Sequence, residues 1–344
     1  MTHSGEFRIG PDDEFPHPVE PVPNFSESVY VNAFDHRAGV GGWARIGNRV
    51  SEGHAEMSVC LYLPDGRLAC RFSRPALSGH QAFAAGGLSY EVLEPLRRVA
   101  MSYRGDVAIL DDPSALHQPT RALSEAPRAT AEIDWILTAT SAVHGGEPTG
   151  PLVRTMYGRD FARGHFNQHA AVSGRMQVGG DAWPIDGFGW RDHSWGPRSW
   201  QAVPWYRLLI GNVGPADGFM ILQISRSDGD GGGRAEPCVA GVLLVDGEYV
   251  DVDDMRLDTT WVADEPARVQ AEIRTRRGVD RITGEILTIA PLRHRQAIDG
   301  QQLQTRIAEG FTRWEWAGRT GYGMSEYLDR IKGGRPVGVM VEAR

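Results

Sequence analysis

Residues 25–34, FSESVYVNAF, alternate between two sets of side chains, and this alternation decides the fold class. Successive side chains of a β-strand point to opposite faces. One face would carry Phe25, Glu27, Val29 and Val31. The other face would carry Ser26, Ser28, Tyr30 and Asn32. A period of two residues predicts a β-strand.

The rest of the chain continues in the same manner, with short runs of Val, Ile, Leu, Tyr and Trp separated by Gly, Asp and Asn. Turn-forming residues stand between these runs at 64–66, 179–180, 186–187, 246–247 and 299–300. The best helical pattern, residues 88–100, is interrupted by Pro95 and suits a bent strand equally. Many short strands with little helix predict an all-β protein built from antiparallel barrels or sandwiches.

Composition limits the classes of function. The 344 residues suit two domains, with 41% hydrophobic and 23% charged residues as in ordinary globular proteins. The net charge of −8 argues against a nucleic-acid partner, which requires a basic surface. Three cysteines without a CxxC pair favour buried thiols in a reducing compartment. Because no signal peptide and no run of about 20 apolar residues is visible, we expect a cytoplasmic protein without an integral membrane segment.

Proline content and the strand pattern divide the chain into parts. Residues 10–24 hold five prolines and predict an extended strap. The Gly- and Asp-rich residues 227–235 are typical of a flexible loop. The expected parts are a Pro-rich N-terminal strap at 1–24, a first barrel at 25–182, a segment at the junction at 183–200 and a second barrel at 201–344.

The segment 183–200, WPIDGFGWRDHSWGPRSW, contains four tryptophans, two arginines, two aspartates and a histidine. Asp192 and His193 supply a carboxylate and an imidazole, the groups needed for acid–base chemistry near neutral pH. In a strand, His193 and Trp195 would share one face, and Asp192 and Ser194 the other. The alternative is a buried joint between barrels, because structural networks also gather ionisable groups.

The stretch GFGWRDHSWGPRSW at 187–200 resembles the central signature of a family of tandem lipocalin-like proteins, which includes the carotenoid hydratases (hydroxyneurosporene synthases) and uncharacterised bacterial relatives. FSESVYVNAFD, GGWARIGNR, PDGRLA and GYGMSEYL extend the resemblance over nearly the whole chain. It implies two lipocalin-like antiparallel β-barrels in tandem, with a pocket for a hydrophobic small molecule. The family's His-x-Trp element, thought to line the active site, falls on His193 and Trp195. The hydratases' Tyr-x-Asp pair has no acid in register here, at 218–222, so the resemblance supports the pocket more than carotenoid hydration.

Two groups of site residues follow. The predicted catalytic residues are His193, Asp192, Trp195 and Glu27. Glu27 is included because burial raises the pKa of a carboxyl group, as a general acid requires. The predicted substrate-binding residues are Trp190, Tyr30, Trp43, His165, Asn167, His169, Arg191 and Trp205. As structural alternatives, Tyr30 and Trp43 are ordinary strand aromatics, and Glu27 pairs with Arg45 or Arg191.

A metal site is a further alternative. His165, Asn167 and His169 would share one strand face, and His193 would add a third imidazole. No spacing typical of a zinc site accompanies them, so we predict a polar lining or a solvated strand face, and no metal.

These features predict a cofactor-independent acid–base enzyme of hydratase, dehydratase, isomerase or cyclase type. Its substrate would be hydrophobic, such as a terpenoid, a steroid or an aromatic compound. The chain shows no dinucleotide-binding or phosphate-loop fingerprint. A non-catalytic carrier of a lipophilic ligand is the alternative. The expected partner is a lipophilic small molecule, and a homodimer is left open.

Overall fold

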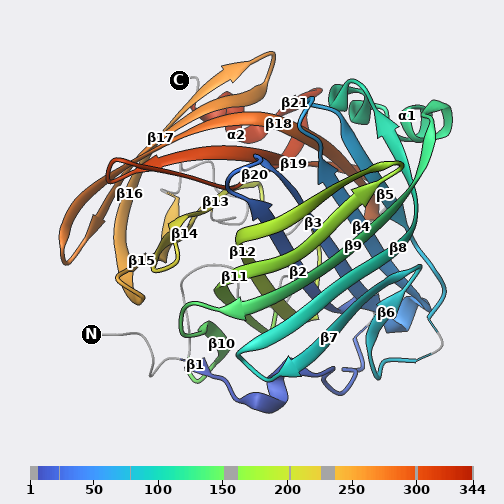
Figure 1. The fold of residues 1–344 in the computed structure, drawn as a ribbon, viewed down its shortest axis with the longest axis horizontal. Helices are drawn as coiled ribbons and strands as arrows, with labels where there is room; N and C mark the ends of the chain where they lie inside the picture. Colours follow the sequence, from blue (N-terminus) through green and yellow to red (C-terminus); the bar gives the residue numbers. More distant parts are fainter. Residues whose placement is uncertain are drawn as a thin grey trace. The chain divides into compact units, whose positions relative to one another are not determined.

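The computed structural model describes residues 7–22, 24–77, 79–150, 162–200, 203–225, 237–298 and 301–342. Strands make up 71% of the structure and helices 7%. The strands of both sheets pair antiparallel with their neighbours (Figure 1). The all-β prediction is therefore confirmed. The loop expected at 227–235 and the turn expected at 299–300 lie outside the described residues.

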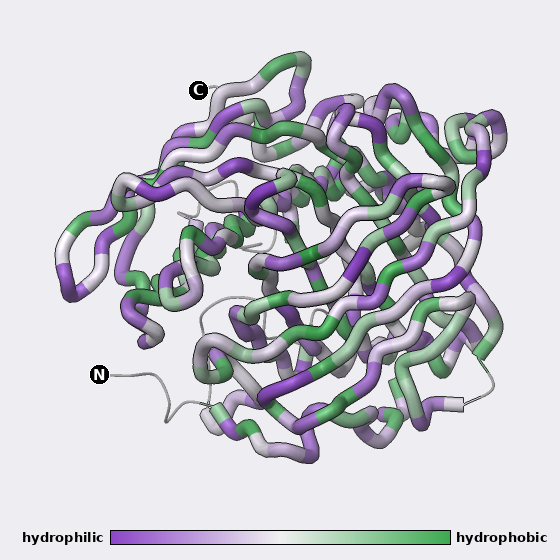
Figure 2. Tube along the Cα trace, viewed as in Figure 1, coloured by the Kyte–Doolittle hydropathy of each residue, from purple (hydrophilic) through white to green (hydrophobic). Residues whose placement is uncertain are grey.

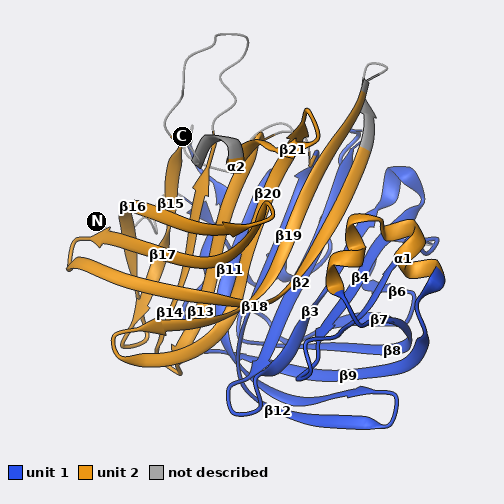
Figure 3. Ribbon diagram, turned by 90° about the horizontal axis from the view of Figure 1, so that it is seen from above, with its two compact units in different colours: residues 1–112, 125–199 blue, residues 113–124, 200–344 orange. Residues whose placement is uncertain are grey.

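The chain divides into two compact units, coloured separately in Figure 3. The first unit contains residues 1–112 and 125–199, and the second contains residues 113–124 and 200–344. Residues 183–197 of the segment expected at the junction belong to a strand of the first unit's sheet.

The first unit is a sheet with a closed ring of eight strands. Its strands are β1 (Phe7–Arg8), β2 (Phe25–Asp35), β3 (Val40–Arg49), β4 (His54–Tyr62), β5 (Leu68–Ser73), β6 (Phe83–Ala85), β7 (Leu88–Glu94), β8 (Arg98–Leu110), β9 (Arg128–Ala139), β10 (His144–Pro148), β11 (Gly164–Val178) and β12 (Asp181–Pro197). The order β11-β12-β2-β3-β4-β5-β8 is closed by β9, which pairs with both β8 and β11. Two short 3-10 helices, Pro11–Glu14 and Val50–Glu52, lie outside the ring.

Apolar side chains from all eight ring strands fill the interior of this barrel. Val29 of β2, Met101 of β8, Trp135 of β9 and Val172 of β11 belong to one buried cluster. Burial of this apolar surface is the main stabilising contribution to the fold. Residues that alternate in phase with Val29 therefore point inward.

The second unit is also a ring of eight strands. Its strands are β13 (Trp205–Gly214), β14 (Asp217–Ile224), β15 (Cys238–Val245), β16 (Glu248–Val262), β17 (Glu265–Thr275), β18 (Gly278–Ile298), β19 (Gln301–Trp316), β20 (Arg319–Lys332) and β21 (Arg335–Pro336). Pairing of β13 with β20 closes the ring β13 to β20. The helices are the 3-10 helix Pro113–His117, α1 (Pro119–Glu125) and α2 (Val337–Glu342).

Hydropathy follows the period of two residues in this unit. β17 alternates almost perfectly between buried and solvent-facing side chains, and Figure 2 shows hydrophilic and hydrophobic residues interleaved along its strands. One face of such a strand packs on the apolar core while the other meets water. Among the described residues, no helix has the length and apolar character needed to cross a membrane.

Candidate functional site

The register between β2 and β12 assigns the predicted catalytic residues to faces. Trp195 lies opposite Glu27, and His193 lies opposite Val29, a member of the interior core. Paired residues point to the same face of a sheet. Glu27, His193 and Trp195 therefore point into the first barrel. Asp192 is adjacent to His193 in the strand and takes the opposite face.

Inside the barrel, three imidazoles surround the carboxylate of Glu27, which is 0% exposed. His17 Nδ1 and His193 Nε2 lie 2.7 Å and 2.8 Å from Oε1. His80 Nε2 lies 2.9 Å from Oε2, and the backbone N–H of His17 donates to the same oxygen at 2.9 Å. We call these four residues the histidine cluster.

Hydrogen-bond partners indicate that His17 is an imidazolium. Its Nδ1 faces Glu27 Oε1, and its Nε2 lies 3.2 Å from Asp13 Oδ1. Since ionised carboxylates only accept hydrogen bonds, both ring nitrogens donate. Burial opposes the charged form, but the hydrogen bonds to Glu27 and Asp13 outweigh it and raise the pKa of His17.

The hydrogen-bond partners of the other two imidazoles identify the ring nitrogen that donates to Glu27. Asn48 Nδ2 donates to the carbonyl oxygen of Ala82 and to His80 Nδ1, at 3.0 Å and 3.1 Å. His80 therefore carries its proton on Nε2 and donates to Glu27. His193 Nε2 also donates to Glu27, while its buried Nδ1 has no hydrogen-bond partner in the described part of the chain.

All three imidazoles of the cluster donate to the carboxylate of Glu27. Burial alone would raise the pKa of Glu27, but hydrogen bonds from His17, His193 and His80 lower it well below its usual range. Glu27 is therefore ionised near neutral pH and does not fit the general-acid role that we expected from its burial. This correction arises because the sequence does not show that three donors meet at one carboxylate.

Aromatic rings enclose the histidine cluster. The indole of Trp195 stacks on His17 at 4.1 Å between centroids and an interplanar angle of 14°. Phe83 and Phe166 meet the His193 ring edge-to-face at 5.2 Å and 5.4 Å. Such contacts exclude water and strengthen the electrostatic interactions of the cluster.

A glycine makes room for the Trp195 ring. Gly164 lies opposite Trp195 in the pairing of β11 and β12. A Cβ atom at this position would overlap the indole. The absence of a side chain at position 164 therefore allows Trp195 to reach His17.

A second buried network attaches the strap to the barrel. Arg191 donates to Glu14 Oε2 from Nη1 at 2.9 Å and to Oε1 from Nη2 at 2.6 Å. It also donates to Gln168 Oε1, and to the hydroxyl of Tyr90 at 2.9 Å. We call Glu14, Tyr90, Gln168 and Arg191 the strap latch. We predicted that Arg191 binds substrate. This residue is instead 2% exposed, and its guanidinium donates these hydrogen bonds to other residues of the protein.

The outward face of β12 holds a different group, which we call the Asp192 face. His165 Nε2 lies 3.4 Å from Asp192 Oδ2. Tyr30 stacks near Trp43 at 5.7 Å and meets Trp190 edge-to-face at 5.9 Å. The side chain of Asp192 is 21% exposed, unlike the sealed carboxylate of Glu27.

Two further predicted residues lie near this group. Asn167 is the direct partner of Asp192 in the pairing of β11 and β12, and His169 is the partner of Trp190. The Asp192 face therefore unites seven of the predicted site residues, namely Tyr30, Trp43, His165, Asn167, His169, Trp190 and Asp192.

The remaining predicted residue, Trp205, belongs to the second unit. Its ring lies 5.1 Å from the guanidinium carbon of Arg207, which is itself fully buried. Arg207 Nη2 donates to Asp329 Oδ1 at 3.1 Å, and Arg306 donates to the other carboxylate oxygen at 3.1 Å. This arrangement gives Trp205 a packing role inside its own barrel.

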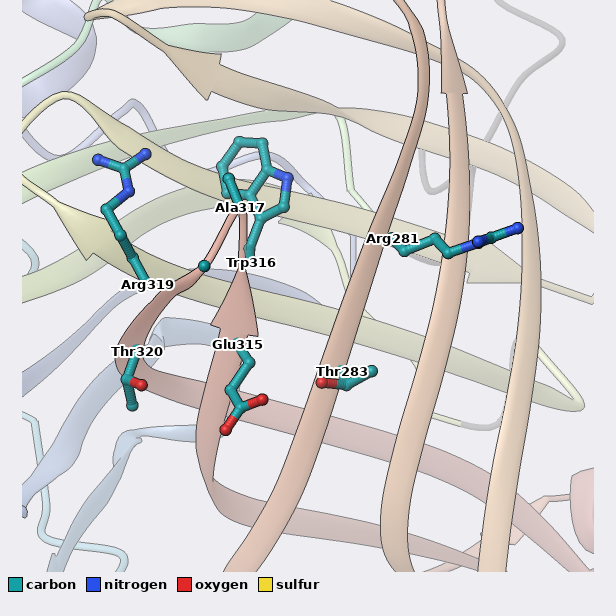
Figure 4. A pocket seen from close by; sticks show the side chains of 8 residues that line it. Arg281, Thr283, Glu315, Trp316, Ala317, Arg319 and Thr320 are labelled. Atoms are coloured by element: carbon teal, nitrogen blue, oxygen red, sulfur yellow. The ribbon is translucent and has the colours of Figure 1, made fainter.

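The second unit also has a surface hollow of about 390 Å³, shown in Figure 4. Its lining residues are Arg281, Thr283, Glu315, Trp316, Ala317, Gly318, Arg319 and Thr320. These residues are mostly polar or charged, and none was predicted from the sequence. The hollow does not have the mainly apolar lining typical of a site for a lipophilic molecule.

Potential metal ligands occur in the histidine cluster. One nitrogen each from His17 and His193 and a carboxylate oxygen of Glu27 lie within 4.8 Å of one another. The alternative set of His165, His169 and His193 is not brought together, because His165 pairs with Ser194 and so lies on the outward face. Sequence reasoning missed His17, whose strap position gave no sign of its partners.

The fold defines the class: a tandem β-barrel protein, each barrel an antiparallel ring of eight strands. Residues 10–331 match the family described as "Domain of unknown function (DUF7064)", and the chain belongs to this family. No curated protein matches the chain significantly.

Solved structures with a similar fold span nearly the whole chain. Kievitone hydratase from Nectria haematococca has a TM-score of 0.61 at 10% identity, covering 95% of this chain and 94% of that one. An AttH-like protein from Nitrosomonas europaea has a TM-score of 0.59 at 15% identity, covering 95% and 98%. CghA with Sch210972 has a TM-score of 0.53 at 10% identity, covering 94% and 95%. At these identities the similarity shows the tandem-barrel fold alone.

Proposed function

We propose that this protein is an acid–base enzyme of hydratase, dehydratase, isomerase or cyclase type that acts on a hydrophobic small molecule at the Asp192 face. One observation carries the proposal: a partly exposed carboxylate, Asp192, lies 3.4 Å from His165 Nε2 on the face that holds Tyr30, Trp43 and Trp190. A carboxylate and an imidazole within reach of each other can share and transfer a proton.

The chemistry follows from these groups. The protonated member of the Asp192–His165 pair transfers its proton to an alkene carbon, or to a hydroxyl group whose C–O bond then breaks and releases water. Ring faces of Tyr30 and Trp190 stabilise the resulting carbocation through their quadrupoles. Addition of water, or loss of a neighbouring proton, completes the reaction and returns one proton to the pair. None of these steps transfers electrons, so the proposed reaction requires no redox cofactor.

The histidine cluster has a supporting role in this proposal. His193, Trp195 and Glu27 were expected to be catalytic, but Glu27 and His193 are both 0% exposed and lie on the opposite face of the sheet from Asp192. They fix β12, which carries Asp192. The reaction class is compatible with the name of one structural neighbour, a hydratase.

The cysteines support a reducing, cytoplasmic location. Cys60 and Cys70 are direct cross-strand partners in β4 and β5, and both are buried. Cross-strand thiols would be exposed to oxidation in a secretory compartment.

Conversion in D2O tests the proposal. The full chain is incubated with a panel of lipophilic alkenes and tertiary alcohols, and mass spectrometry detects gain or loss of water and deuterium bound to carbon. Asp192→Asn should lower turnover by roughly 10²–10⁴-fold, the usual contribution of a positioned acid or base. Ligand affinity, measured by tryptophan fluorescence, should change little because the apolar walls remain.

Asp186→Asn is the matched control. Asp186 lies on the same strand and has the same phase as Asp192, but it is solvent-exposed. Its variant should keep the parent rate. A carrier would bind members of the panel and return them unchanged, and unchanged turnover in Asp192→Asn would remove Asp192 from the mechanism.

A further inference from the structure

We propose that His17, Glu27 and His193 form a binding site for one divalent transition-metal ion, which clamps the strap to the first barrel. The inference is independent of the Asp192 face, because the two groups lie on opposite faces of β12. It goes beyond the acid–base function and stands on the geometry of the cluster.

The ligand atoms have the required chemistry and proximity. His17 Nδ1 and His193 Nε2 converge on Glu27 Oε1 at 2.7 Å and 2.8 Å. Two imidazoles and one carboxylate form a ligand set that binds iron, zinc and related ions. An ion placed between them would take the position of the two ring protons that now point at Glu27.

Neighbouring groups already occupy positions typical of a second coordination shell. A metal-bound histidine commonly donates its other ring N–H to a carboxylate, as His17 Nε2 does toward Asp13 Oδ1 at 3.2 Å. The second oxygen of Glu27 accepts hydrogen bonds from His80 Nε2 and from the His17 backbone. These contacts fix the orientations of two of the three ligands before an ion arrives.

The ligands come from parts of the chain that an ion would join. Glu27 belongs to β2 and His193 to β12, while His17 lies on the strap. Glu27 and His193 are sealed in the barrel, and the His17 side chain is 18% exposed, which gives an ion a route of entry. Bound metal would therefore link the strap to β2 and β12.

Cobalt titration of the full chain tests this site. After removal of metals with a chelator, Co²⁺ is added while visible absorption and tryptophan emission are recorded. We expect one ion per chain and quenching through Trp195, whose ring stacks on His17. His17→Gln and His193→Gln should weaken binding by more than about 100-fold, and Asp13→Asn by about 10–100-fold.

Two controls separate this site from other sites. His54→Gln removes a histidine outside the cluster and should bind Co²⁺ like the parent chain. Asp192→Asn should also bind normally, so that failure of the acid–base proposal leaves this one intact. If His193→Gln does not fold, the Co²⁺ affinity of His17→Gln tests the proposal by itself. This variant should fold, because the side chain of His17 is partly exposed. The proposal is overturned if the parent chain takes up no stoichiometric Co²⁺, if His17→Gln binds as tightly as His54→Gln, or if a thiolate-to-cobalt band identifies cysteine ligands.

Discussion

At the scale of single residues, Glu27 of β2 and Asp192 of β12 show how burial separates the roles of two carboxylates. Glu27 is surrounded by donors and stays charged, whereas Asp192 has one nearby imidazole and reaches solvent. They belong to the neighbouring strands β2 and β12 and point to opposite faces of the sheet. One sheet can thus carry a buried ionic cluster on its inner face and a reactive group on its outer face.

His36 gives a residue-scale prediction of pH dependence. Burial, only partly offset by the charge of Asp35, lowers the pKa of His36 from 6.5 to about 4. As pH falls below 6.5, the unfolded chain binds a proton that the folded chain does not. Stability should therefore decrease from pH 6.5 toward 4, by up to about 1.4 kcal/mol per pH unit.

His36→Phe should flatten this dependence while keeping the edge-to-face contact with Phe188. Urea unfolding between about pH 5 and 6.5 isolates the effect, because carboxylates with lowered pKa values lose their contribution only below their unfolded values. His17, whose pKa is raised, acts in the opposite sense and mainly above pH 6.5. An unchanged slope in the variant would contradict the assignment to His36.

At the scale of elements, the buried ion pair of Glu14 and Arg191 joins the strap to the first barrel. Glu14 and Arg191 are both nearly inaccessible to water, and their side chains form a bidentate pair. Removal of one partner leaves the other charged and buried. Glu14→Gln should therefore destabilise the first barrel by about 3–5 kcal/mol.

Glu20 provides a comparison on the same strap. It pairs with Arg163, whose side chain is half exposed, and surface pairs of this kind contribute about 0–1 kcal/mol. Chemical denaturation of Glu14→Gln and Glu20→Gln should thus give clearly different losses. Equal losses would mean that the strap latch does not hold the strap.

At the scale of the whole molecule, the sequence predicted the class of fold because its signals are local. Alternation at 25–34 predicts a strand, and Phe25–Asp35 forms one. The pattern at 88–100 became two strands, β7 and β8, joined by a turn in which Leu96 has a φ of 58°. A single residue with positive φ reverses the chain, and this is not visible in periodicity.

The site was harder to predict because its parts are distant along the chain. Tyr30 and Trp190 were identified as aromatic candidates, and the barrel brings them together on one face. His17 and His80 were missed, since they meet Glu27 only after the strap and the segment before β6 have folded over the barrel. The spacing of residues along a short stretch of sequence cannot predict contacts between such distant residues.

The connectivity of the chain has a consequence for inheritance. Residues 113–124 belong to the second unit although the flanking residues belong to the first. There His117 Nε2 lies 3.1 Å from Glu265 Oε1, and Arg293 Nη2 donates to His117 Nδ1 at 3.1 Å. Genetic recombination between two relatives at a single point near residue 200 would combine His117 from one parent with Glu265 and Arg293 from the other. Exchange of a whole barrel between two genes therefore requires three crossover points. We expect the coding sequences of the two barrels to be inherited together.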